Sequence, residues 1–172
     1  QPLLLGSVYV LSGSLTIVMS IGVGMSALTL SSGEILAGSG IVSDYLVNGG
    51  TVSPGTSPGE INVSGYYTQE PGGTLEIDLG GTYAGIEYDT LFVTSLATLD
   101  GTLNVHLIND FVPQLGDFFH IVTYGTHEGE FATENLPALP PGLAWQIDYT
   151  DERITLTVVE APLRLFLPML VK

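Results

Sequence analysis

Apolar and polar residues alternate along several short stretches of the chain, and no stretch has the 3.6-residue period of an amphipathic helix. A period of two places successive side chains on opposite faces of a strand. Each alternating stretch therefore predicts a β-strand with one buried face. The apolar positions of these stretches are Leu75, Ile77 and Leu79; Leu103, Val105 and Leu107; Leu143, Trp145, Ile147 and Tyr149; and Ile154, Leu156 and Val158.

Turn residues separate the stretches at intervals that are typical of an all-β protein. A small residue followed by a short apolar strand recurs in Gly73–Ile77 and Gly101–Val105, with near relatives at Gly13–Ile17 and Ser26–Leu30. One such strand cannot bury its apolar face alone, whereas stacked copies share a continuous core. The repeat favours a parallel β-helix, also called a β-solenoid. Because its period is irregular, a β-sandwich remains the alternative.

Residues 48–159 carry a series of motifs in a characteristic order. The series includes Gly50–Gly55, Gly65–Gln69, Gly73–Leu79, Tyr88–Val93, Ala97–Leu103, Gly116–Val122, Gly129–Phe131 and Gly142–Trp145. In this order the motifs resemble the C-terminal part of autotransporter-type passengers of bacterial surface proteins. The resemblance implies a right-handed parallel β-helix at the outer surface of a bacterium. The tail Pro162–Lys172 is similar to the endings of secreted proteins from Chloroflexi-type bacteria.

The chain divides by composition into three segments. Residues 1–47 are predicted to form apolar, Gly- and Ser-rich solenoid turns and to contribute to assembly. Residues 48–160 are predicted to form the C-terminal part of the β-helix, and residues 161–172 an apolar tail.

Charge excludes several classes of partner. The chain of 172 residues has 3 Lys and Arg against 18 Asp and Glu, a net charge of −15. Nucleic-acid binding needs a basic face, and attraction to anionic lipid needs basic residues too. We therefore expect neither partner.

With 45% hydrophobic residues the chain has enough apolar material for a core. It has no Cys, which excludes disulfides and thiolate zinc sites.

An uncharged stretch opens the chain, because the first charged residue is Glu34. Leu15–Leu30 is its best candidate for a transmembrane helix. Gly and Ser interrupt this stretch every few residues, and no Lys or Arg flanks it. We therefore predict buried strands here and no membrane span.

The sequence predicts no catalytic, cofactor-binding or metal-binding residue. Gly22-x-Gly24-x-x-Ala27 resembles a dinucleotide fingerprint, but a strand and turn follow it where the chemistry needs a helix. The spacing of His106, His120 and His127 matches no metal motif. The carboxylates Asp148, Asp151 and Glu152 form no calcium loop, and the last two are predicted to lie at a hairpin tip.

Two further features concern glycans. Asn62 is a candidate glycosylation site, because Asn62-Val63-Ser64 is an Asn-x-Ser acceptor with Glu60 two residues before it. Tyr66–Tyr67 and Phe118–Phe119 are candidate stacking platforms for sugars. In each pair, alternation is expected to bury one ring and expose the other.

The two ends of the chain lack a polar cap, which a monomeric solenoid needs. An apolar, β-prone end can template a second subunit. The sequence therefore favours an extracellular bacterial structural protein that assembles head-to-tail with copies of itself into a filament or surface layer. One alternative is an adhesin or a module that binds cell-surface glycans, and another is a polysaccharide-active β-helix enzyme. The predicted assembly contacts are Leu3, Leu4, Leu5, Val8, Val10, Leu15, Ile17, Leu165, Phe166, Leu167, Met169 and Leu170.

Overall fold

The computed structural model of the chain describes residues 27–55 and 58–162, and these residues form strands and no helix. The strands are β1 (Ala27–Leu30), β2 (Ile35–Gly38), β3 (Gly40–Val42), β4 (Tyr45–Asn48), β5 (Thr51–Pro54), β6 (Glu60–Val63), β7 (Tyr67–Gln69), β8 (Thr74–Leu79), β9 (Thr90–Leu99), β10 (Thr102–Leu107), β11 (Phe118–Gly129), β12 (Thr133–Asn135), β13 (Leu143–Tyr149) and β14 (Arg153–Glu160). The prediction of an all-β protein is confirmed.

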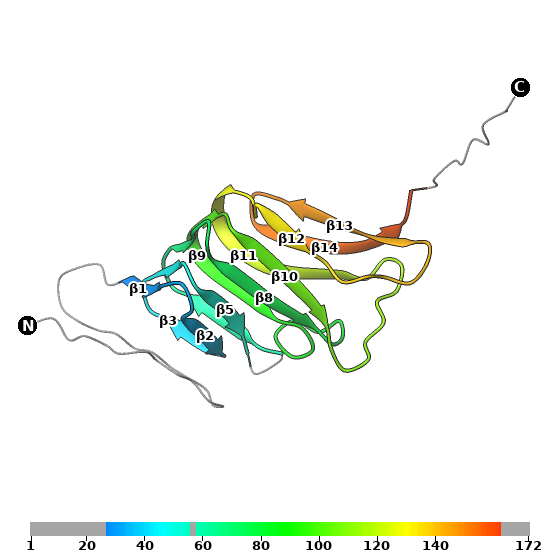
Figure 1. The fold of residues 1–172 in the computed structure, drawn as a ribbon, viewed down its shortest axis with the longest axis horizontal. Coiled ribbons are helices and arrows are strands. Elements are labelled where there is room, and N and C mark those ends of the chain that lie inside the picture. The colour runs from blue at the N-terminus through cyan, green and yellow to red at the C-terminus, as the bar shows by residue number, and fades with distance from the viewer. Residues whose placement is uncertain (1–26, 56–57, 163–172) are drawn as a thin grey trace, which may run out of the picture.

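The strands form two sheets (Figure 1). The larger sheet runs β1-β4-β7-β9-β11-β14-β13, with β6 beside β9 and β3 beside β6. The smaller sheet runs β12-β10-β8-β5-β2. Neighbouring strands are parallel, except that β14 is antiparallel to both β11 and β13.

Strands pair with strands about one circuit further along the chain. In the first circuits β1 pairs with β4, which pairs with β7. In the same way β2 pairs with β5, which pairs with β8, and β3 pairs with β6, which pairs with β9. The long strand β9 serves two columns, since Thr90–Val93 pair with β6 and Ala97–Thr98 pair with β7. This connectivity is compatible with a β-solenoid.

The Gly-Thr repeat marks the start of strands in the smaller sheet. Thr51, Thr74, Thr102 and Thr133 are register partners in one column. The amide of Thr102 donates to the carbonyl of Gly73 at 2.9 Å, and that of Thr74 donates to Gly50 at 2.8 Å. Successive partners in this column lie further apart in the sequence, because the connections become longer. That lengthening is why the repeat in the sequence is irregular.

The predicted alternation sets the core. Leu75, Ile77 and Leu79 of β8 are fully buried, and so are Ile154 and Leu156 of β14. The apolar residues of β13 are partly buried and pack against this core. These strand predictions are therefore confirmed.

A group of polar side chains lies inside the core at the turn between the two sheets. Asn48 Nδ2 donates to the carbonyl of Thr74 at 2.9 Å and to the hydroxyl of Tyr67 at 3.2 Å, while Asn48 Oδ1 accepts from the amide of Gly50 at 3.1 Å. Gln69 Nε2 donates to the carbonyl of Thr102 at 2.9 Å. These contacts supply partners for buried polar groups, as stability requires.

The β13–β14 hairpin lies at the C-terminal end of the larger sheet (Figure 1). Residues 150–152 connect its strands, so Asp151 and Glu152 lie at the hairpin tip, as predicted. Trp145 packs its ring edge-on to Phe119 at 5.9 Å between centroids and donates from Nε1 to the carbonyl of Pro137 at 2.9 Å. The hairpin thus covers part of the core at this end.

Within the described residues, no helix is long and apolar enough to cross a membrane. The last four residues of the candidate span Leu15–Leu30 form β1. The rest of that stretch lies outside the described residues.

Candidate functional site

The outer face of the larger sheet carries polar and aromatic side chains on β11, β14 and β13. Alternation directs Phe119, Ile154 and Leu156 into the core. It directs Phe118 and Thr155 outward, and the ring of Phe118 is 56% exposed. We call this surface the β11–β14–β13 face.

Register assembles the β11–β14–β13 face from these three strands, together with Phe92 of the neighbouring strand β9. Phe118 pairs with Thr157, which pairs with Gln146, and these three form one row. The next row consists of His120, Thr155 and Asp148. A third row contains Phe92, Thr123 and Arg153. A bulge between His120 and Val122 shifts the register, and it leaves Ile121 and Val122 both buried.

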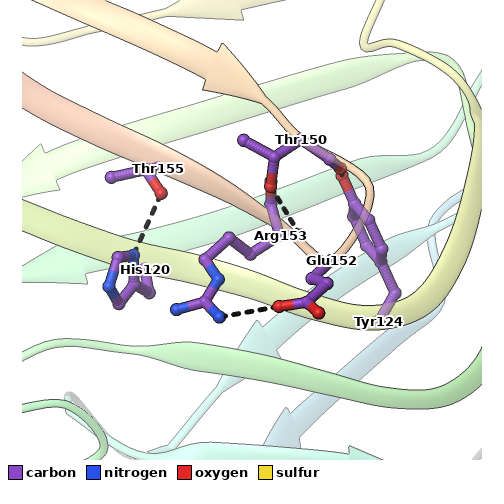
Figure 2. A network of polar contacts seen from close by, with 6 residues as sticks. All are labelled: His120, Tyr124, Thr150, Glu152, Arg153 and Thr155. Atoms are coloured by element: carbon purple, nitrogen blue, oxygen red, sulfur yellow. Dashed lines mark hydrogen bonds and ion pairs between the residues drawn. The ribbon is translucent and has the colours of Figure 1, made fainter.

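Hydrogen bonds order the polar side chains of this face (Figure 2). His120 Nδ1 lies 3.0 Å from Thr155 Oγ1, and the Arg153 guanidinium donates to Glu152 Oε2 at 3.0 Å. Partial burial, and secondarily the charge of Arg153, lower the pKa of His120. The lowered pKa favours the neutral imidazole near pH 7, and because Nδ1 is engaged with the Thr155 hydroxyl, Nε2 is the ring nitrogen that can hydrogen-bond to a ligand.

The chemistry of the β11–β14–β13 face suits binding. Gln146 Nε2 donates to both carboxylate oxygens of Asp148, at 3.0 and 2.9 Å. The rings of Phe118 and His120 lie side by side, with centroids 5.2 Å apart. Planar polar groups beside an exposed ring can hydrogen-bond and stack against a ligand. No group of three or more metal-ligating side chains occurs in the part of the chain that the structure describes.

A second surface is the open end formed by β1, β2 and β3. Among the named strands, each of these pairs on one side only. Ile35 is 57% exposed and Ile41 46% exposed. A shallow depression here is lined mainly by apolar atoms of Leu36, Ile41 and Ile61. Unpaired strand edges with apolar side chains are templates for strand addition.

The predicted assembly contacts between Leu3 and Ile17 and between Leu165 and Leu170 lie outside the described residues. The candidate glycosylation site Asn62 lies in the middle of β6, between β3 and β9. Its Nδ2 donates to Glu60 Oε1 at 2.7 Å. Glycosylation of Asn62 stays a prediction.

The two aromatic pairs divide between core and surface as predicted. Tyr67 and Phe119 are fully buried, while Tyr66 is 42% exposed and Phe118 is the more exposed ring. Tyr66 stacks on Tyr45 with centroids 4.7 Å apart, so one of its faces is already covered. Phe118 is therefore the better platform for a ligand.

The three histidines lie in separate surroundings. His106 is exposed on β10 and pairs with Glu76 at 2.8 Å. His127 lies near the rings of Tyr124 and Tyr149. His120 belongs to the β11–β14–β13 face, and no periodicity or motif singled it out. The one hint of the β11–β14–β13 face in the sequence was Arg153, because it is the only basic residue before the C-terminal tail.

A buried carboxylate, Asp89, joins a turn to the smaller sheet. Its Oδ1 accepts from the amide of Gly59 at 2.7 Å, and its Oδ2 accepts from the amide of Asp78 at 2.9 Å. Burial raises the pKa of Asp89 to about 7, against the lowering effect of these two amides. The contacts on both carboxylate oxygens are made within the fold, which indicates a structural role.

No protein-family model matches the chain. A search of curated proteins finds no significant match either.

Proposed function

We propose that the protein is an extracellular structural protein of a bacterial surface, and that it assembles head-to-tail with copies of itself into a filament or layer. In this proposal the chain is a right-handed parallel β-helix of the autotransporter-passenger type. Parallel columns of strands support the solenoid, and right-handed crossovers between parallel strands are strongly preferred in proteins.

The observation that carries the proposal is the smaller sheet, β12-β10-β8-β5-β2. All its pairings are parallel, and among the named strands β2 and β12 each pair on one side only. The β12 edge of one copy can therefore pair in parallel with the β2 edge of the next and continue the sheet. Such contact joins two different surfaces, and a heterologous contact that does not close produces an open filament. The terminal segments 1–30 and 162–172 contribute further contacts at the same joints.

Charge favours growth along the stack over sideways aggregation. The described residues include 18 carboxylates, whereas Arg153 is their one Lys or Arg. Neighbouring filaments therefore repel one another through their outer faces. At the open end the exposed side chains Ile35 and Ile41 are apolar, so this end lacks such protection.

A charge at the open end tests the proposal. Continuing the register of this column across the joint places Ile35 of one copy beside Thr133 of the next, so Ile35→Glu puts a charge where strand pairing would exclude water. Because Ile35 is 57% exposed, the substitution is expected to change the free energy of unfolding by less than about 0.5 kcal/mol. Sedimentation velocity of the full chain should show large assemblies that Ile35→Glu converts to monomers.

The matched control is Ile86→Glu, which changes the same residue type in the connection between β8 and β9, where Ile86 is 75% exposed. We expect this variant to assemble like the unmodified chain. Assembly that survives Ile35→Glu, or that both variants lose equally, would refute the proposed joint.

A further inference from the structure

Two exposed rings bracket the β11–β14–β13 face. Phe118 lies in its first row, and Phe92, which is 41% exposed, lies in its third row beside Thr123. From strand spacings the two rings are roughly 15 Å apart along the surface. This separation suits a chain of several sugar rings better than a single small molecule.

Hydrogen-bonding groups fill the space between these rings. The row of His120, Thr155 and Asp148 crosses the face between the Phe118 row and the Phe92 row. Asp148 offers carboxylate oxygens that accept hydrogen bonds, and His120 offers its ring Nε2, since its Nδ1 is engaged with Thr155. Gln146 is exposed next to Asp148 and adds an amide. Hydroxyl groups, which both donate and accept, match this mixture.

Charge on this face disfavours an anionic ligand. Arg153 is the one permanent cation among the described residues, and it is paired with Glu152 at 3.0 Å. Asp148 and the net charge of −15 would repel an acidic polymer. An uncharged polymer pays no such cost.

We propose that the β11–β14–β13 face binds a neutral polysaccharide chain, with Phe118 and Phe92 as stacking platforms and Gln146, Asp148, His120 and Thr155 as hydrogen-bonding groups. This function goes beyond self-assembly and does not depend on it, because the face is contained in one chain. In a filament the same face would recur on every subunit, and multivalency would strengthen a weak single site.

Titration calorimetry of the full chain tests the proposal with four probes. The neutral probes are cellohexaose, maltohexaose and mannohexaose, and the acidic probe is hexagalacturonate. We expect at least one neutral hexaose to bind and hexagalacturonate to bind more weakly. Phe118→Ala should raise the Kd for the bound hexaose roughly tenfold, because it removes one of the two stacking contacts.

Tyr66→Ala is the matched control, since Tyr66 is also an exposed aromatic residue but precedes β7, outside the β11–β14–β13 face. It should leave the Kd unchanged, while Asp148→Ala should weaken binding. The circular dichroism spectrum of each variant shows whether it is folded. The proposal is overturned if no neutral hexaose binds at millimolar concentration, if hexagalacturonate binds more tightly than every neutral probe, or if Tyr66→Ala weakens binding as much as Phe118→Ala.

Discussion

Replacing Asn48 with alanine should destabilise the fold strongly, although the side chain is polar and lies next to a turn. Asn48 is fully buried and contacts two backbone groups, the amide of Gly50 and the carbonyl of Thr74. Removing the side chain leaves both groups without this partner inside the core. A buried polar group that loses its partner costs about 1–3 kcal/mol, so the expected loss is about 2–6 kcal/mol.

Asn104, in the middle of β10, provides the comparison, because it is an asparagine that makes its side-chain hydrogen bonds outside the core. Its side chain lies on the outer face of β10, where it donates to Glu76 and accepts from Asn135, both at 2.8 Å. Water can replace these partners, so Asn104→Ala should cost less than about 1 kcal/mol.

Urea unfolding at low protein concentration, followed by circular dichroism, measures both free energies. If Asn48→Ala costs no more than Asn104→Ala, the buried hydrogen bonds do not contribute in the way argued above. A change in the slope of unfolding free energy against urea would instead indicate that the substitution alters the unfolded ensemble.

Three further results are expected from the same unfolding assay. Gly73→Ala should cost at least about 2 kcal/mol, because a Cβ would lie 2.1 Å from a backbone oxygen, whereas Gly72→Ala meets nothing within 4 Å and should be nearly neutral; equal costs would contradict this packing. The folded protein keeps a proton on Asp89 between its unfolded pKa of 3.8 and its folded pKa of about 7. Its contribution should therefore make stability fall as pH rises across this range, and Asp89→Asn should remove that slope; an unchanged slope would contradict the raised pKa. Trp145→Phe should cost about 1 kcal/mol by removing the hydrogen bond to Pro137, and a neutral result would show that this bond adds nothing.

Alternation predicted strands well where one face is buried and the other exposed. Leu75, Ile77 and Leu79 illustrate this, because each neighbouring side chain points outward and is polar. Strands β9 and β11 were harder, since each continues from one column of the stack into the next and has irregular burial. The bulge after His120 places two consecutive residues in the core, which no period of two predicts.

Buried polar residues were the main feature that the sequence concealed. Asn48 precedes two glycines, so it reads as part of a turn, yet its side chain points inward and joins Tyr67 and Gln69. The hydrogen-bonding pattern of neighbouring turns decides this orientation, and that pattern depends on which turns are stacked.

The β11–β14–β13 face could not be assembled from the sequence for a similar reason. His120 and Asp148 are distant along the chain, and each reads as an ordinary surface residue. Their proximity depends on the antiparallel register of β14 with its two neighbours. The sequence did predict that Phe118 or Phe119 would be exposed, and Phe118 is.

Negative-stain electron microscopy of the full chain without added ligand tests the central claim most directly. The account predicts regular unbranched filaments or layers in which subunits repeat head-to-tail, and it predicts that Ile35→Glu abolishes them. Dispersed particles of single-chain size from the unmodified protein would contradict it.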